Sequence, residues 1–162
     1  MDGHEIKKKP AYTPQQARLK AENYCAYQER SQQEVRDRLY AWGLHKSDVE
    51  TIIADLIADN FLNEERFARN YASGKFKLKG WGRQKIKQGL QLKAVSRPLI
   101  ALAINSLDEA AYRMALQELL RKKANSLTEH NPYKRKHQLL RYAQGKGYEG
   151  DLILEILSDN EL

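Results

Sequence analysis

The feature that most constrains the fold of this chain is an internal repeat. When the sequence is shifted by 51 residues, apolar positions coincide without a gap through two stretches and the turn between them. The coinciding pairs are Val35 with Ile86, Leu39 with Leu90, Leu44 with Val95, Val49 with Ile100, Ile53 with Ile104 and Leu56 with Leu107. A shift of 104 residues sets Gly43 on Gly147 and continues into the next apolar stretch. Two helices can show matching apolar spacing by chance, because the helical period is general. A match that continues through the turn between them is harder to obtain by chance, so we expect tandem copies of one unit.

Each copy carries the signals of α-helices and almost none of β-strands. Apolar residues recur at the spacing of one buried helix face in residues 49–57, 112–120 and 152–157. Residues of the types that cap helix starts precede these and other stretches, namely Thr13, Ser31, Ser47, Asn63, Ser96, Asp108 and Asn131. Gly43 and Gly147, each followed by an apolar residue, indicate helix ends that turn through a left-handed glycine.

We therefore predict an all-α protein of about nine helices, arranged as three tandem three-helix repeats. Because each unit in such an array packs only on its neighbours, the repeats should form an elongated, curved helical array with one long face. The expected segments are an N-terminal extension at 1–20, an acidic repeat at 21–72, a repeat that is basic at its start at 73–124, and a third repeat at 125–162. That shape suits binding to another extended molecule rather than enclosing a small substrate.

Composition and motifs argue against several other classes of protein. The longest apolar run, Leu99–Ile104, has six residues, whereas a membrane span needs roughly 18. The single cysteine, Cys25, cannot form an internal disulfide and lies on a predicted apolar stripe, so we expect a buried, unreactive thiol. The polar N-terminus lacks the apolar stretch of a secretory signal, which favours a cytoplasmic protein. No metal-ligand spacing and no glycine-rich phosphate loop occurs, so we expect neither enzyme activity nor a metal or cofactor.

Charge is strongly segregated along the chain. The whole chain has 28 Lys and Arg against 21 Asp and Glu, a net charge of +7. Residues 22–65 carry four basic and ten acidic side chains, whereas residues 66–107 carry ten basic side chains and no acidic one. An ordinary solvated surface mixes the two signs, because like charges repel. We interpret the +10 segment as an electrostatic footprint for phosphates or for an acidic protein surface.

The most distinctive stretch is residues 75–87, within this basic segment. Basic residues alternate there with apolar ones across a predicted helix end, a Gly-Trp-Gly turn and a helix start. Arg83 and Lys87, one helical turn apart and away from the predicted core face, should point outward together. Trp81 has two readings, because it either packs between units or offers a stacking face to a base or an arginine. The candidate binding residues are Lys75, Lys77, Lys79, Trp81, Arg83, Lys85, Lys87, Lys93 and Arg97.

Three short motifs resemble those of the RecX-type regulators. Residues 60–68 read Asn-Phe-Leu-Asn-Glu-Glu-Arg-Phe-Ala, which resembles the family pattern Gly-Tyr-Leu-Asp-Asp followed by Arg-Phe-Ala. Residues 79–82, Lys-Gly-Trp-Gly, are similar to the family's Lys-Gly-x-Gly. Upstream, the stretch that starts at Arg30 with Arg-Ser-Gln-Gln-Glu-Val resembles the family's Arg-Ser-x-x-Glu-Leu opening. The resemblance extends from Ala21 to the C-terminus and agrees with three three-helix units.

The chain also departs from the family pattern at a few positions. Asn60 replaces a glycine, and Asn63 and Glu64 replace two aspartates. Ala94-Val95 stands where the family tends to have Gly-Ile. These replacements largely keep the chemistry of helix starts and helix ends, so the resemblance still implies the family's fold.

The resemblance implies a non-enzymatic regulator, specifically an inhibitor, of the RecA recombinase. Such a protein lies in the groove of the RecA–DNA filament and limits filament extension and activity in DNA repair, recombination and the SOS response. The resemblance also implies contact with single-stranded DNA, or with double-stranded DNA, and we expect a monomer. The +10 segment would then face DNA phosphates or acidic filament patches. Residues 22–65 and the acid-only end at 149–161 would face basic patches on the recombinase.

Two other binding functions are compatible with the same residues. The competing hypothesis is a recombinase-independent single-stranded nucleic-acid-binding helical protein. A third hypothesis is an adaptor for a different protein, which would use the same helical array. Binding to DNA without any effect of RecA would favour the first of these.

Overall fold

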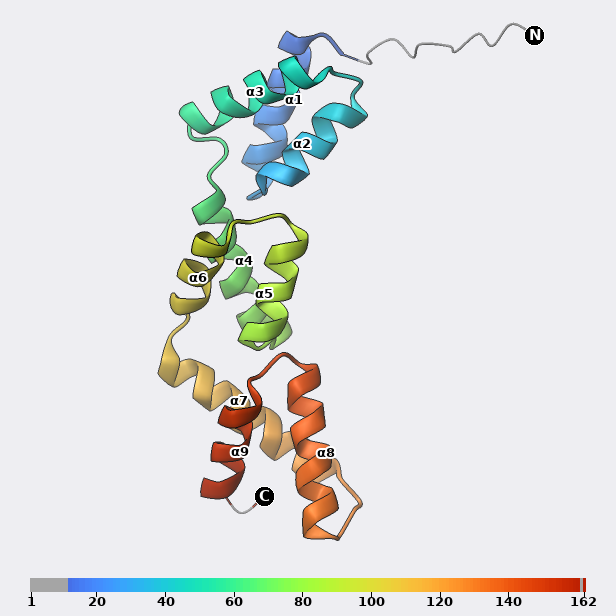
Figure 1. Ribbon diagram of the computed structural model, residues 1–162, viewed down its shortest axis with the longest axis vertical. Coiled ribbons are helices and arrows are strands. Elements are labelled where there is room, and N and C mark those ends of the chain that lie inside the picture. The colour runs from blue at the N-terminus through green and yellow to red at the C-terminus, as the bar shows by residue number, and fades with distance from the viewer. Residues whose placement is uncertain (1–11, 161) are drawn as a thin grey trace, which may run out of the picture. The chain divides into compact units, whose positions relative to one another are not determined.

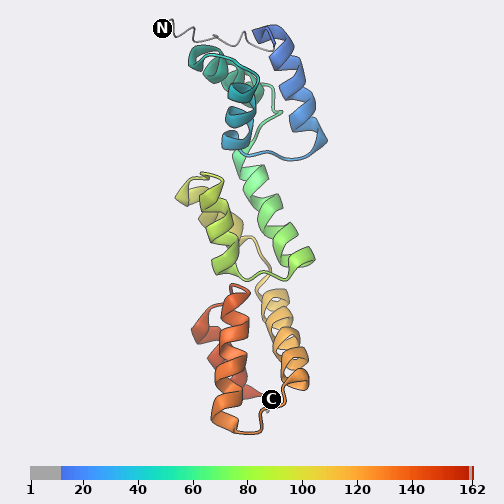
Figure 2. The same ribbon diagram turned by 90° about the vertical axis from the view of Figure 1, so that its right-hand side faces the viewer.

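The computed structural model describes residues 12–160 and 162, and every regular element in them is an α-helix (Figures 1 and 2). The helices are α1 (Pro14–Tyr27), α2 (Gln32–Ala41), α3 (Lys46–Ala58), α4 (Glu64–Lys79), α5 (Arg83–Leu92), α6 (Arg97–Asn105), α7 (Glu109–Ser126), α8 (Pro132–Gly145) and α9 (Gly150–Asp159). The all-α fold predicted from the apolar spacing is therefore confirmed.

The helices group in threes along the chain. Helices α1, α2 and α3 contact one another, α5 packs on α6, and α8 packs on both α7 and α9. Helix α4 lies beside α5 (Figures 1 and 2), where the Tyr71 hydroxyl of α4 fills the space next to Gly89 of α5. The predicted arrangement of three tandem three-helix repeats is confirmed.

The chain divides into two compact units. The first consists of the described residues up to Phe67 together with the turn Lys93–Val95, and the second consists of Ala68–Leu92 and Ser96–Leu162. Helix α4 therefore begins in the first unit and continues in the second. The expected segment boundaries at 20/21, 72/73 and 124/125 fall inside α1, α4 and α7, and that finer division stays a prediction.

Residues that the repeat register pairs occupy equivalent buried places. Val35 of α2 and Ile86 of α5 are fully buried, as are Leu39 and Leu90 one helical turn later. The other buried pairs are Leu44 with Val95, Val49 with Ile100, and Leu56 with Leu107. The first two repeats thus place matching apolar residues in their cores, as the shared register predicts. The exception is the pair Ile53 and Ile104, because Ile53 is buried and Ile104 is only half-buried.

Most helices begin at the predicted capping residues. The side-chain oxygens of Thr13, Ser31, Asn63, Asp108 and Asn131 each accept a hydrogen bond from the backbone N–H three residues later, at 2.8–3.3 Å. Ser96 precedes α6 as predicted, but its side chain makes no capping hydrogen bond. These bonds satisfy backbone donors that have no partner inside the helix.

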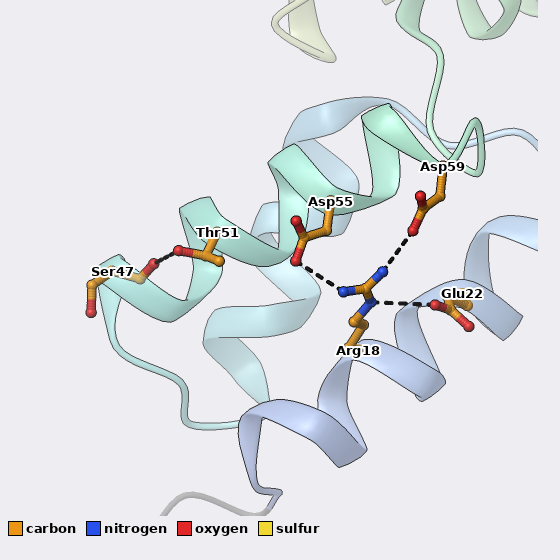
Figure 3. Close-up of polar contacts among 6 residues, drawn as sticks. All are labelled: Arg18, Glu22, Ser47, Thr51, Asp55 and Asp59. Atoms are coloured by element: carbon orange, nitrogen blue, oxygen red, sulfur yellow. Dashed lines mark hydrogen bonds and ion pairs between the residues drawn. The ribbon is translucent and has the colours of Figure 1, made fainter.

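The predicted cap at Ser47 is wrong. Helix α3 begins at Lys46, and its N-cap is His45, whose carbonyl accepts the first helical hydrogen bond from Val49 N–H at 3.0 Å. Ser47 lies in the first turn, and its carbonyl accepts a hydrogen bond from the Thr51 hydroxyl at 2.9 Å (Figure 3). Leu44 is buried directly after the preceding turn, and α3 starts two residues later, just as α6 starts two residues after the buried Val95. The start of α3 therefore follows the spacing of the repeat and not the capping residue at Ser47.

The predicted left-handed turns are present in the first and third repeats. Gly43 has φ of +87° and Gly147 has φ of +97°. In the third repeat, Tyr148 N–H donates to the Ala143 carbonyl at 3.1 Å, the bond that closes a Schellman turn. The equivalent residue of the second repeat is Ala94, which adopts φ of +57° despite its β-carbon.

An arginine at the centre of several carboxylates joins α1 to α3 in the first unit (Figure 3). The Arg18 guanidinium lies 3.0 Å from the Asp55 carboxylate and 2.6 Å from that of Asp59, and it also contacts Glu22 of its own helix at 3.4 Å. Because the side chains of Arg18, Asp55 and Asp59 are all more than one-third exposed, water screens these pairs and their contribution to stability is small. The group keeps an excess of negative charge on this side of the unit.

Cys25 of α1 is buried, as predicted, with 7% of its surface exposed. Burial raises the pKa of its thiol from 9.0 to about 11. At pH 8 the reactive thiolate is then on the order of one molecule in a thousand, so we expect a disulfide reagent to label the folded protein slowly and the guanidinium-unfolded protein at once.

The raised pKa also has a consequence for stability. The folded state favours the protonated thiol, so the associated stability is present below pH 9 and is lost as pH rises from about 9 to about 11. In the labelling experiment, a rate for the folded protein as high as that for the unfolded protein would contradict a buried thiol.

Candidate nucleic-acid interface

The basic stretch is built on the end of α4 and the start of α5. After the last residue of α4, Gly80 turns the chain with φ of +68°. Gly80 N–H donates to the Phe76 carbonyl and Trp81 N–H donates to the Lys75 carbonyl, both at 3.1 Å. The Gly80 bond ends the helix in the αL motif, and the Trp81 bond returns Trp81 toward the last turns of α4.

Trp81 lies between two lysines. Its ring is half-buried, and the ammonium groups of Lys75 and Lys85 lie 4.9 Å and 4.8 Å from the ring centre. Both distances are those of cation–π contacts. We refer to Lys75, Trp81 and Lys85 as the Trp81 platform. Both ammonium groups lie over the ring. A lysine that leaves the ring to pair with a phosphate uncovers a face on which a base can stack, so the group offers single-stranded nucleic acid both kinds of contact.

The remaining predicted residues are distributed over three helices and a turn. The exposed ones are Lys77 and Lys79 in the last turn of α4, Lys87 in α5 and Arg97 at the first position of α6. Lys93 belongs to the turn that packs with the first unit, and its ammonium lies 3.4 Å from the Glu34 carboxylate. An ion pair does not abolish phosphate binding, but it makes Lys93 a weaker candidate than the exposed lysines.

Gly82 has a packing role that the sequence analysis missed. Its N–H donates to the Lys146 carbonyl at 2.8 Å, and Gln84 N–H donates to the Gly147 carbonyl at 2.9 Å. A β-carbon at Gly82 would overlap the backbone atoms of Gly147 and Tyr148. The second glycine of the Gly-Trp-Gly turn therefore lets the start of α5 meet the turn before α9 backbone to backbone. No local signal links these two segments, which are 65 residues apart.

Arg83 is held inside the second unit rather than presented to solvent. Its guanidinium pairs with the Glu149 carboxylate at 2.8 Å and also with that of Glu109, and its side chain is 20% exposed. The guanidinium carbon lies 3.8 Å from the centre of the Tyr112 ring. The expectation that Arg83 points outward beside Lys87 is wrong, because two carboxylates and an aromatic face compete with water for the guanidinium.

Tyr112 and Glu149 complete this buried polar group. Arg83 N–H donates to the Tyr112 hydroxyl at 2.9 Å, and that hydroxyl donates to the Glu149 carboxylate. Burial raises the pKa of Tyr112 far above its ordinary range, and burial raises the pKa of the neighbouring Tyr148 to about 12. Burial lowers the pKa of Arg83, but its hydrogen bonds to Glu149 and Glu109 outweigh that effect and raise the pKa above its ordinary value. Tyr112 therefore stays neutral and Arg83 stays charged.

A groove of about 470 Å³ lies between α5 and α6. Helix α6 contributes Arg97 and three aliphatic side chains, and α5 contributes Lys87. The complete lining is Arg83, Gln84, Lys87, Gln91, Arg97, Ile100, Ala101, Ile104, Asn105 and Glu149. We refer to it as the α5–α6 groove. The nine predicted residues thus fall into the Trp81 platform, the lining of this groove, the exposed end of α4, and Lys93 apart from the others.

The described part of the chain holds neither a metal-binding cluster nor a membrane-spanning helix. No three His, Cys, Asp or Glu side chains between residues 12 and 160, or at 162, are placed to share a metal ion. Over the same residues, no helix has the length and apolar character needed to cross a membrane.

Curated relatives align with most of this sequence. A regulatory protein RecX from Clostridium botulinum (strain Eklund 17B / Type B) is 32% identical over 132 residues, which cover 80% of this chain and 61% of that protein. The chain thus spans about three-fifths of the length of that relative. A regulatory protein RecX from Haemophilus influenzae (strain PittGG) is 27% identical over 140 residues, covering 86% of this chain and 91% of that protein.

Solved structures share the fold. The crystal structure of RecX from Lactobacillus salivarius superimposes with a TM-score of 0.84 at 23% identity, covering 90% of this chain and 95% of that one. A second crystal structure, of a regulatory protein RecX, gives a TM-score of 0.78 at 18% identity and covers 91% of this chain and 74% of that one.

Family models match each of the three repeats. They describe the first, second and third three-helix domains of RecX, and they match residues 17–56, 63–104 and 112–157. The three models follow one another in the order of the repeats, and together they include residues from all nine described helices. This chain belongs to the RecX family of regulatory proteins.

Proposed function

We propose that this chain is a non-enzymatic inhibitor of the RecA recombinase that binds the RecA–DNA filament and limits its extension and activity. The observation that carries the proposal is the segregation of charge within a member of this regulatory family. Residues 66–107 carry ten basic side chains and no acidic one, next to an acidic segment of net charge −6. A protein that only coats DNA has little use for the acidic segment, whereas a filament offers both DNA phosphates and protein surface.

The DNA-binding part of the proposal rests on the exposed cations of the second unit. Lys77, Lys79 and Lys87 are exposed, and the Trp81 platform adds an aromatic face between two ammonium groups. Each lysine that neutralises a phosphate releases a bound counterion, which supplies affinity and makes binding dependent on salt. Arg83 is left out of this surface because its charge is already paired with Glu149 and Glu109.

The recombinase-binding part rests on the acidic segment of the first unit. Several of its carboxylates are already paired, as in Arg36 with Glu50 at 2.8 Å and Arg66 with Glu29 at 2.5 Å. The carboxylates around Arg18 outnumber the cation that they share. That remaining negative charge suits a basic patch on a protein and repels DNA, so it orients the chain on a filament.

The decisive experiment measures the ATPase activity of RecA preassembled on single-stranded DNA while this chain is added. We expect suppression at amounts well below those that cover the DNA, because a protein that acts on filaments needs few copies for each filament. A recombinase-independent single-strand binder would act only near full coverage of the DNA. Suppression that needs full coverage, or that an unrelated single-strand binder reproduces equally, would overturn the proposal.

Replacing the three exposed lysines Lys77, Lys79 and Lys87 with alanine should weaken binding to oligo(dT) and flatten its salt dependence. The slope of log K against log[salt] should fall by about 0.7 for each phosphate that the variant no longer neutralises. The helices should persist, because alanine is the better helix former. The matched control is the pair Lys134→Ala and Lys136→Ala on α8, where both lysines are also exposed. Equal slopes for both variants and the original chain would show that the basic stretch is only a solvated surface.

A further inference from the structure

The α5–α6 groove carries positive charge that its own acid does not neutralise. Lys87 and Arg97 line it and are exposed, and within the described part of the chain neither forms an ion pair. The one carboxylate in the lining is Glu149, which already binds Arg83 and the Tyr112 hydroxyl. The groove therefore presents two available cations beside a pair that is already satisfied, and it attracts an anionic ligand.

The other half of the groove is aliphatic. Ile100 and Ala101 lie in one turn of α6 and Ile104 lies in the next. Ile100 is buried, so the accessible aliphatic surface comes from the exposed Ala101 and the half-buried Ile104. None of the residues that line the groove is aromatic. Bases of single-stranded nucleic acid bind by stacking on aromatic rings, which this surface lacks. An aliphatic surface instead buries an aliphatic side chain. The groove therefore suits a ligand that joins carboxylates to an aliphatic group, which describes an acidic peptide better than it describes a nucleic acid.

The amides and the size of the groove agree with a peptide. Gln84, Gln91 and Asn105 line it, and each side-chain amide both donates and accepts hydrogen bonds, as a peptide backbone requires. A volume of about 470 Å³ accommodates a few residues rather than a folded domain.

We propose that the α5–α6 groove binds a short acidic segment of a protein partner, seating one aliphatic side chain on Ala101 and Ile104 while flanking carboxylates pair with Lys87 and Arg97. This inference deepens the proposed function, and it rests on that function only for identifying the filament protein as the partner. It assigns protein binding to the groove and base stacking to the Trp81 platform. Lys87 borders the groove and is also one of the exposed cations of the DNA-binding surface, so substitutions at Ala101 and Trp81, rather than at Lys87, distinguish the two surfaces.

The test uses the full chain and a random 12-residue peptide library displayed on phage. The key variant is Ala101→Glu, which places a carboxylate at an exposed helical position in the aliphatic half of the groove. Its matched control is Ala54→Glu, an exposed alanine of α3 in the first unit. Melting curves followed by circular dichroism establish that both variants fold. The selected peptide is then synthesised with a fluorescent label, and its binding is measured beside that of labelled oligo(dT).

We expect the selected peptides to be rich in Asp and Glu around Leu, Ile, Val or Met. Ala101→Glu should weaken the peptide about tenfold or more, because it sets a carboxylate against an acidic ligand, while Ala54→Glu should change its affinity less than about twofold. Oligo(dT) binding should change by less than about threefold in Ala101→Glu. Replacing Trp81 with alanine should produce the reverse pattern, with a loss of oligo(dT) binding and little change in peptide binding.

Three outcomes would overturn the proposal. The first is a library selection that enriches no acidic peptide, and the second is peptide binding that survives Ala101→Glu. The third is a loss of oligo(dT) binding in Ala101→Glu as large as its loss of peptide binding, which would make the groove a nucleic-acid site. The RecA ATPase assay keeps this failure distinct from failure of the proposed function. An original chain that suppresses RecA but binds no acidic peptide refutes only the groove assignment, whereas peptide binding without suppression refutes the function.

Discussion

Replacing Gly82 with alanine should destabilise the second unit by about 3 kcal/mol or more. The new β-carbon would overlap the backbone of Gly147 and Tyr148, which has no flexible side-chain end that could move away. Relieving the overlap separates the start of α5 from the turn before α9. It thereby breaks the hydrogen bonds from Gly82 N–H to the Lys146 carbonyl and from Gln84 N–H to the Gly147 carbonyl. Thermal unfolding followed by circular dichroism should show a midpoint roughly 6–12 °C lower.

Gly74→Ala is the matched control for this substitution. Gly74 lies inside α4, and a β-carbon there would meet no atom within 4 Å. Alanine costs less backbone entropy than glycine in a helix, so this variant should be as stable as the original chain or more stable by up to about 1 kcal/mol. A difference of less than about 2 °C between the melting midpoints of Gly82→Ala and Gly74→Ala corresponds to less than roughly 1 kcal/mol of stability. That result would show that the backbone-to-backbone contact does not constrain the fold.

Replacing Glu149 with alanine should cost about 2–4 kcal/mol of stability. Glu149 is the acceptor for both the Arg83 guanidinium and the Tyr112 hydroxyl, and the side chains of Arg83 and Glu149 are only 20% and 22% exposed. Removing the carboxylate leaves a largely buried cation with one exposed partner and a buried hydroxyl without its acceptor. Urea denaturation of the variant and the original chain measures the difference.

Two substitutions around the same arginine separate burial from charge. Glu109 also pairs with Arg83, but its side chain is 64% exposed, so Glu109→Ala should change stability by less than about 1 kcal/mol. Glu149→Gln keeps a hydrogen-bond acceptor while removing the charge, so it should lose roughly half as much stability as Glu149→Ala. Equal losses in Glu109→Ala and Glu149→Ala would mean that the buried group behaves as an ordinary surface ion pair.

Features that depend on neighbours in the sequence were predictable from the sequence. The helix starts at Thr13 and Asn131 depend on a side chain and a backbone N–H three residues apart, and the turn at Gly43 depends on one residue's conformational freedom. The repeat extends this local information, since Val35 and Ile86 occupy the same place in successive copies of one unit. The same motifs led to the family, so fold and family both followed from patterns spanning a few residues.

Features that depend on which distant segments meet were decided by the tertiary structure. The sequence presents Arg83 as one cation among ten in a segment without acids, and its carboxylate partner Glu149 lies 66 residues away. In the sequence, Gly82 is simply the second glycine of a Gly-Trp-Gly turn. In the structure, its close contact with the backbone of Gly147 leaves no room for a side chain. Helix α3 likewise begins at Lys46, two residues after the buried Leu44, and not after the capping residue Ser47.

The sequence by itself determined the class of fold, the three-helix repeats and the position of the basic segment, because helix periodicity, capping and net charge are properties of short stretches of chain. Only the tertiary structure decided which of those cations are available. It buried Arg83 between two carboxylates, set Trp81 between Lys75 and Lys85, and left Lys87 and Arg97 beside an aliphatic strip of α6. The reason is that a charge is free or paired according to what lies within about 4 Å of it, and in a folded chain those neighbours come from residues far along the sequence.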